Sequence, residues 1–192
     1  SFILFFGVFL FYSAVVSAKK PTFVGTEGCK CHKNEVKEWQ ESKHGKAFQT
    51  LLADKRGKGE KKAMKKAKLE PDKDYSKDEK CLKCHTAGYG DIGGFDAIDK
   101  TPDLAGVGCE MCHGAGSEYR KIHKEKDVNF TLAEAKEAGE IFPAKDNPCK
   151  NCHESKDTPF KPEVDEKYKF NFSEMIKLEK AFHKVYPLQG KR

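Results

Sequence analysis

Apolar positions recur at helical spacing in a few separated stretches of the chain. Residues 34–52 place five apolar side chains at that spacing, which predicts a helix. Residues 55–68 hold many lysines with small apolar residues between them and predict an exposed helix that Pro71 ends. Thr131 and the glutamate three residues later form a capping box for a short helix closed by Gly139.

The remaining pattern adds one helix and one long loop. Ser173 is predicted to cap a last helix, which carries His183 and stops before Pro187. Residues 87–108 contain six glycines and predict a loop that can bring backbone close to a flat cofactor. No strand pattern is convincing, so the expected fold is mainly α with long loops.

The first eighteen residues differ from the rest of the chain. They carry no charge, hold five of the fourteen Phe and end in Val16-Ser17-Ala18, which predicts a secretory signal peptide cleaved after Ala18. An uncleaved membrane anchor is the alternative, because eighteen uncharged residues reach the lower edge of spanning length. Residues 19–192 are then expected to form a single exported domain.

Residues 19–192 contain all 66 charged residues and little material for an apolar core. Low hydrophobicity with high charge is typical of disorder. Eight cysteines argue for order, because they fall into four close pairs and a histidine follows each pair directly. The four segments are Cys29-x-Cys31-His32, Cys81-x-x-Cys84-His85, Cys109-x-x-Cys112-His113 and Cys149-x-x-Cys152-His153.

A histidine after every pair decides between the possible roles of the cysteines. Four disulfides would not require it, nor would a zinc ribbon built from the second and third pairs. C-x-x-C-H is the signature of c-type heme attachment, in which two thiols add to the heme vinyl groups and the histidine binds iron. The first segment is one residue short, which allows a strained double attachment or a single thioether from Cys31. Four covalently bound heme c groups are therefore expected.

The ligand count predicts one open iron. Beyond the four proximal histidines, only His44, His123 and His183 remain, which leaves three hemes with two histidines and one with a single histidine. Met64 lies in the lysine run and is expected to be solvated, and Met175 is expected to pack on a helix. Since ten helical residues span about 15 Å, His123 and His113 serve different hemes. Distal histidines that come from distant segments would tie these segments together and make the hemes the core of the fold.

Several runs outside the heme segments carry a family resemblance, among them Phe23-Val24-Gly25, Gly106-Val107-Gly108-Cys109-Glu110 and residues 158–165. On these residues the chain closely resembles the tetraheme cytochrome c-554 family, which accepts electrons from hydroxylamine oxidoreductase in ammonia-oxidising bacteria. The resemblance implies three bis-histidine hemes and one five-coordinate heme at His85. It further implies His123 on the first heme, His183 on the third and His44 on the fourth.

The expected function is a periplasmic electron carrier between a hydroxylamine-oxidoreductase-like donor and a membrane or soluble cytochrome acceptor. Nitric oxide reduction or other small nitrogen-compound chemistry at the His85 heme is one alternative, and a subunit of a cytochrome filament is another. The formal net charge is +6, but eight heme propionates bring the holoprotein close to neutrality, so a nucleic-acid partner is not expected. The lysines of residues 58–68 form either a solvated face or a docking site for an acidic redox partner.

Overall fold

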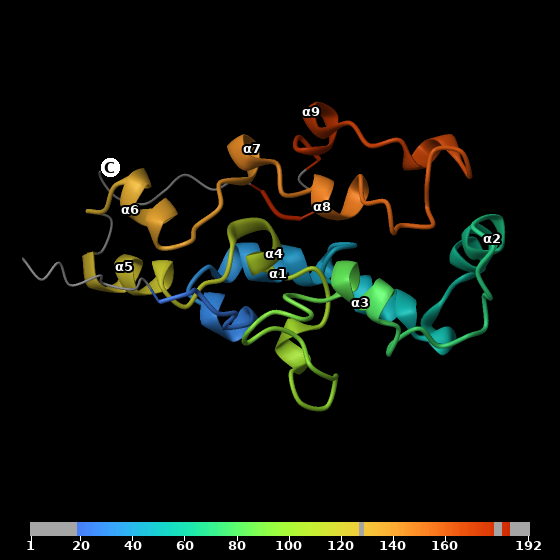
Figure 1. Ribbon diagram of the computed structural model, residues 1–192, viewed down its shortest axis with the longest axis horizontal. Coiled ribbons are helices and arrows are strands. Elements are labelled where there is room, and N and C mark those ends of the chain that lie inside the picture. Colours follow the sequence, from blue (N-terminus) through green and yellow to red (C-terminus); the bar gives the residue numbers. More distant parts are fainter. Residues whose placement is uncertain (1–18, 127–128, 179–181, 185–192) are drawn as a thin grey trace, which may run out of the picture.

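The computed structural model describes residues 19–126, 129–178 and 182–184 (Figure 1). The mainly α prediction is confirmed: the described residues form helices joined by long loops, with no strand and one isolated bridge between Thr86 and Ala105. None of the described helices combines the length and apolar character needed to cross a bilayer. The predicted signal segment, residues 1–18, lies outside the described residues.

The helices are short, and the two longest of those described have nine residues each. The α-helices are α1 Lys33–Glu41, α2 Lys58–Lys66, α3 Glu79–His85, α4 Cys109–His113, α5 Tyr119–Lys126, α6 Leu132–Glu137, α7 Pro143–Asp146, α8 Lys150–His153 and α9 Phe172–Met175. The 3₁₀ helices are η1 Thr26–Cys29, η2 Ala47–Leu51, η3 Ala53–Lys55, η4 Pro102–Leu104 and η5 Glu166–Tyr168.

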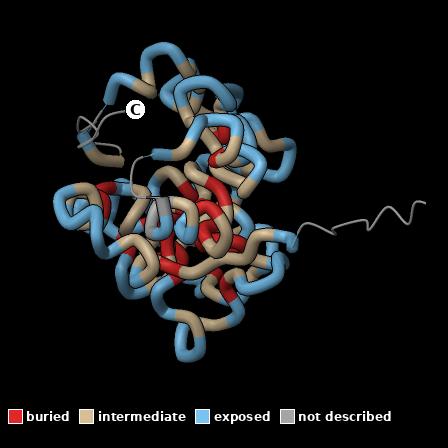
Figure 2. The backbone as a smooth tube through the Cα atoms, turned by 90° about the vertical axis from the view of Figure 1, so that its left-hand side faces the viewer, coloured by how far each residue is buried: buried red, intermediate tan, exposed pale blue. Residues whose placement is uncertain are grey.

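The elements form two layers. In Figure 1, one layer contains α1, α3, α4 and α5, and the other, above it in this view, contains α6 to α9. Helix α2 lies at one end of the long axis. Figure 2 shows that buried backbone gathers in the first layer. In the described part of the second layer, only Ala135 and Pro148 are buried. The second layer therefore has almost no apolar core of its own.

The core of the first layer joins α2, α3, η2 and the glycine-rich loop. Its buried residues are Phe48, Leu51, Met64, Tyr75, Leu82, Ala87, Phe95 and Leu104. The expectation that Met64 is solvated is wrong, because this side chain is only 7% exposed. The lysines of α2 occupy the other faces of an amphipathic helix, and Met64 lies on the one face that packs against the core.

The predicted helix over residues 34–52 is interrupted. α1 ends at Glu41, and the chain turns before it resumes as η2. The Ser42 hydroxyl donates to the Trp39 carbonyl (2.7 Å) and accepts the Gly45 N–H (3.1 Å), so it competes with the helical hydrogen bonds. A Cβ at Gly45 would lie 2.2 Å from the Trp39 carbonyl oxygen, and the tight turn therefore requires glycine. This turn carries His44.

The predicted last helix is also different. α9 begins after Asn171, so Ser173 lies inside the helix and does not cap it. The helix ends at Met175, and His183 lies in an irregular segment beyond it, while Pro187 is outside the described residues. Four residues offer too few backbone hydrogen bonds to continue a helix through this charged stretch without tertiary support.

Two helices end in the same Schellman turn, one with glycine and one without. The capping box of α6 is confirmed, and Gly139 closes the helix at φ 94°. In α2 the equivalent position is Lys68, at φ 58°, with the Leu69 N–H donating to the Met64 carbonyl (2.9 Å). This turn, and not Pro71 as predicted, ends α2.

Lys68→Gly is expected to stabilise the protein by about 0.5–1 kcal/mol, because glycine adopts the left-handed conformation without a Cβ penalty. Lys68→Gln is the matched control, since it removes the same charge and keeps the Cβ. Thermal unfolding of the two holoproteins measures the difference. A Gly variant no more stable than the Gln variant would contradict the assignment of strain to this turn.

Candidate heme sites

Each cysteine segment sits on or beside a short helix that orients its side chains. In α3 and α4 both cysteines and the following histidine are helical, and the i, i+3 spacing puts the two sulfurs on one face. The fourth segment has the same form, with Cys149 just before α8. In the shortened first segment, Cys29 is the last residue of η1 and His32 occupies the N-cap position of α1.

The four segments meet in a fixed spatial order. The side chains of Cys29 and Cys109 interact, and so do those of Cys84 and Cys152, an interaction that lowers the pKa of Cys84 to about 7. Cys149 lies close enough to Cys112 to raise its pKa electrostatically, although burial raises that pKa more. The order in space is therefore first, third, fourth and second segment.

Among the described residues, the cysteine contacts do not join the cysteines of the second segment to those of the third, as a zinc ribbon would need. Across the described residues, no three His, Cys, Asp or Glu side chains converge on a point that could hold a metal ion unaided. Each cysteine contact instead joins two different segments, which is the arrangement expected when neighbouring cofactors are each attached through their own cysteines.

Two predicted proximal histidines each face a second histidine from a distant segment. The ring centres of His44 and His153 are 6.1 Å apart, with their planes at 87°. Those of His113 and His183 are 6.4 Å apart, with their planes at 24°. Two imidazoles on opposite sides of one metal, with nitrogen about 2 Å from it, place their ring centres roughly 6 Å apart. The residues present therefore fit iron porphyrins.

Burial favours the neutral form of these imidazoles. Desolvation lowers the pKa of His113 and that of His153, and the paired histidine of each adds a smaller lowering. A neutral imidazole has a free nitrogen lone pair, which is the form that binds a metal. The Phe170 ring stacks on His153 at 4.8 Å and contributes to this apolar environment.

His85 is held by a different set of contacts. Its Nδ1 lies 2.8 Å from the Ala47 carbonyl oxygen and 3.2 Å from Thr50 Oγ1. An Nδ1–H that donates to a carbonyl leaves Nε2 available for a metal. In the described part of the chain, no second histidine ring pairs with His85. Burial lowers its pKa as well.

The two paired histidines outside the motifs are positioned through the backbone. The Nδ1–H of His183 donates to the Lys184 carbonyl (2.6 Å), and the Lys184 N–H donates to Glu38 Oε2 on α1 (2.7 Å). The His44 carbonyl accepts the Val107 N–H (3.0 Å), while the indole of Trp39 donates to the Val107 carbonyl (2.7 Å). The first set of contacts attaches the His183 segment to the first layer, and the second fixes the His44 turn within that layer.

The predicted partner of the first heme, His123, lies on α5, and its side chain is outside the described part of the structure. The pairing of His32 with His123 therefore stays what the family resemblance implies. His32 itself lies near His113, whose pKa it lowers slightly.

The buried carboxylate of Glu110 fixes the irregular stretch of chain that leads into the first segment. Glu110 is 3% exposed and accepts the backbone N–H groups of Val24 (2.9 Å), Gly25 (2.8 Å) and Gly116 (2.7 Å). Both carboxylate oxygens are used. Because Glu110 lies inside the third segment, this network joins the first and third heme sites.

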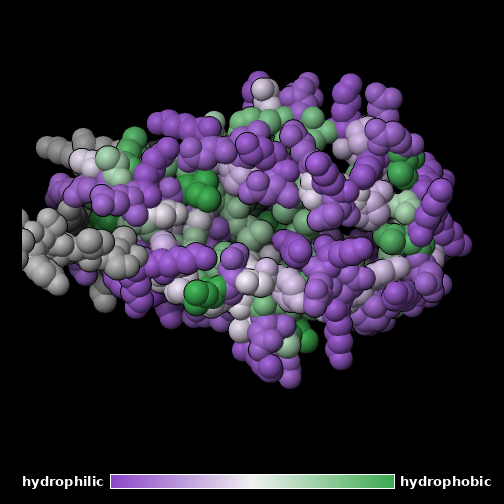
Figure 3. All heavy atoms as spheres, viewed as in Figure 1, coloured by the Kyte–Doolittle hydropathy of each residue, from purple (hydrophilic) through white to green (hydrophobic). Residues whose placement is uncertain are grey.

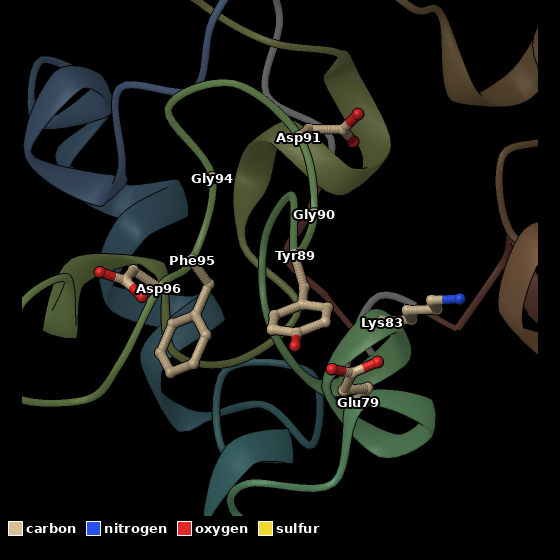
Figure 4. A pocket seen from close by; sticks show the side chains of 8 residues that line it. All are labelled: Glu79, Lys83, Tyr89, Gly90, Asp91, Gly94, Phe95 and Asp96. Atoms are coloured by element: carbon tan, nitrogen blue, oxygen red, sulfur yellow. The ribbon is translucent and has the colours of Figure 1, made fainter.

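A surface hollow of about 590 Å³ lies beside α3 (Figure 4). The rings of Tyr89 and Phe95 lie side by side in it, with Glu79 near Tyr89. None of its lining residues is a cysteine or histidine. Lys83, which lines the hollow, stands between Cys81 and Cys84, so the hollow borders the second heme segment. Phe95 also packs into the core, with its ring centre 5.5 Å from that of Phe48.

The histidines and cysteines were all evident from the sequence, but their supports were not. Glu38, Thr50 and Glu110 act through contacts with backbone or with a histidine from another segment. Glu110 stands between two heme cysteines, which is the only local sign of its role. Glu38 and Thr50 carry no such sign.

A helical domain in which four Cys–Cys–His segments meet defines a multiheme c-type cytochrome, an electron-transfer protein. Residues 28–114 match the family model described as cytochrome c554 and c-prime. The chain is 37% identical to cytochrome c-554 of Nitrosomonas europaea, over 88% of this chain and 77% of that protein. It belongs to the cytochrome c554 family.

A solved structure, the reduced state of cytochrome c554 from Nitrosomonas europaea, matches with a TM-score of 0.78 and 36% identity. The match covers 90% of this chain and 89% of that chain. Membership implies covalently bound c-type hemes, and c-type cytochromes are typically extracytoplasmic.

Glu110→Gln is expected to destabilise the holoprotein by about 2–3 kcal/mol, because the amide nitrogen replaces one of two buried acceptor oxygens and faces backbone donors. Glu163→Gln is the control at an exposed carboxylate, with an expected change within about 0.5 kcal/mol. Denaturant unfolding followed by heme absorbance measures both. Equal stabilities of the two variants would contradict the anchoring role.

Proposed function

We propose that this chain is a tetraheme electron carrier. One heme c would be attached at each segment, through Cys29 and Cys31, Cys81 and Cys84, Cys109 and Cys112, and Cys149 and Cys152. The proposal rests on two histidine pairs whose ring centres lie 6.1 and 6.4 Å apart. Each pair brings the histidine of one heme segment close to an imidazole from a distant part of the chain. The shortened first segment attaches its heme through Cys31, with or without Cys29.

Three hemes then have two histidine ligands: His32 with His123, His113 with His183, and His153 with His44. Bound heme supplies reversible one-electron chemistry at iron. The chain orients the imidazoles, and burial lowers the pKa of His85, His113 and His153, which favours their neutral form. Sulfur contacts between neighbouring segments support close packing of the hemes, in the order first, third, fourth and second.

The fourth iron, on His85, is proposed to be five-coordinate and open to a small ligand such as nitric oxide. The absence of a second histidine ring at His85 among the described side chains supports this. The proposed donor is a hydroxylamine-oxidoreductase-like enzyme, and the proposed acceptor is a membrane or soluble cytochrome. The proposed location is the periplasm, reached after removal of residues 1–18.

Replacement of a distal histidine tests the ligand set. His44→Ala, His123→Ala and His183→Ala are each expected to convert one low-spin heme in the holoprotein to high spin, because each leaves one iron without its sixth ligand. Electron paramagnetic resonance and optical spectra measure the change, and intact mass shows whether all four hemes are retained.

Glu41→Ala serves as the control for these variants, since Glu41 is exposed on α1. The spectra of this control variant should match those of the parent protein. An unchanged spin state in any histidine variant removes that residue from the ligand set. Fewer than four hemes in the parent protein contradicts the tetraheme proposal.

Nitric oxide added to the reduced holoprotein is expected to give a nitrosyl signal equal to one heme in four, because only the His85 iron is open. The signal should be absent in a sample held under argon. A stoichiometry of zero contradicts the open site, and a stoichiometry above one contradicts the bis-histidine ligation of the others.

A further inference from the structure

The positive charge of the chain is concentrated on one short segment. Residues 58–68 contain six lysines and one glutamate, a net charge of +5, whereas the other 181 residues together carry +1. This segment comprises α2 and its terminal turn and lies at one end of the long axis (Figure 1). Hydrophilic side chains predominate at that end of the molecule in the view of Figure 3, with small hydrophobic areas among them.

One face of α2 presents lysines that form no ion pair in the described part of the chain, although Lys65 helps to lower the pKa of Asp72. Lys58, Lys62 and Lys65 lie at i, i+4 and i+7 on the helix and are exposed, and none forms an ion pair within the described residues. Lys61 and Lys66 are different, since they pair with Asp72 (2.5 Å) and Asp165 (2.9 Å). Like charges at this spacing repel one another, so the face gains stability from an external anionic surface.

The opposite face of α2 is fixed to the part of the fold that holds His85. Met64 packs in the core with Leu82 of α3, the helix that ends at His85. At the base of the segment, Arg56 is 6% exposed and donates to the carbonyls of Thr50 (2.6 Å) and Pro71 (2.8 Å). Thr50 also contacts His85, so α2 is attached to the surroundings of this heme site.

Heme binding increases the contrast between this face and the rest of the surface. Each heme c adds two propionate groups, so the four proposed hemes add eight carboxylates to the 181 residues that are otherwise almost neutral. The holoprotein then has a positive pole at α2 and a predominantly negative remainder. Such a charge distribution orients an approaching acidic protein towards α2.

We propose that the α2 face formed by Lys58, Lys62 and Lys65 is the docking site of an acidic electron-transfer protein, which exchanges electrons with the nearby His85 heme. This inference rests on the electron-carrier function proposed above. In the donating direction, one electron leaves the reduced centre of the partner and converts one ferric heme of this protein to ferrous heme.

The test uses the holoprotein and reduced plant-type ferredoxin, a small acidic one-electron donor, in stopped-flow reduction at low ionic strength. K58Q/K62Q/K65Q is expected to lower the second-order rate constant about tenfold, and added salt should remove the difference. The matched control is K20Q/K145Q/K177Q, which removes the same charge from exposed lysines elsewhere and should change the rate less than twofold. Neutral lumiflavin radical should reduce all three proteins equally.

Equal losses in the two triple variants would overturn the docking site, since they would show an effect of net charge alone. An unchanged ferredoxin rate in the α2 variant would overturn it too, and loss of binding to phosphatidylserine vesicles in that variant would then assign the face to a membrane surface. Failure of lumiflavin to reduce the parent hemes would instead contradict the carrier function itself.

Discussion

On the proposed ligation, the fold depends on one distance: two imidazoles that share an iron have ring centres roughly 6 Å apart, on opposite sides of a flat macrocycle. His153 and His113 come from helices that bear their own cysteines, but His44 and His183 come from elsewhere in the chain. The turn at Ser42–Gly45 and the contact of Glu38 with the segment after His183 serve this spacing. Their local geometry is irregular because the position of an imidazole, and not helix length, determines it.

The same constraint explains how a chain so poor in apolar residues keeps two layers together. The first layer has a small core around Leu51 and Leu82, while the second layer buries little of its own surface. Direct links between the layers include the packing of Phe160 against the first-layer core, the hydrogen bond from the Ile141 N–H to the His113 carbonyl (2.8 Å) and the ion pair of Lys66 with Asp165. An exposed ion pair of this kind contributes at most about 1 kcal/mol. The proposed hemes, attached to both layers, provide the remaining contact.

Much of this organisation could be predicted from the sequence, and the failures have physical causes. The cysteine and histidine spacing is fixed by the chemistry of attachment, so it predicted the c-type heme that family membership implies, while the proximal ligands stay a prediction. The α6 capping box is equally local. The helix over residues 34–52 failed because Ser42 and Gly45 form a turn that helical periodicity does not reveal. Met64 was misassigned because its lysine neighbours masked a single buried face.

The angles between the paired rings have an electronic consequence. An axial imidazole interacts most strongly with the iron d orbital that lies perpendicular to its own plane. If each pair shares an iron as proposed, the nearly parallel rings of His113 and His183 would act on the same orbital, whereas the crossed rings of His44 and His153 would act on two different ones. The crossed arrangement leaves those two orbitals close in energy, and the parallel arrangement separates them. On the proposed ligation, two irons with identical ligands differ in magnetic anisotropy, and each carries its own spectroscopic label.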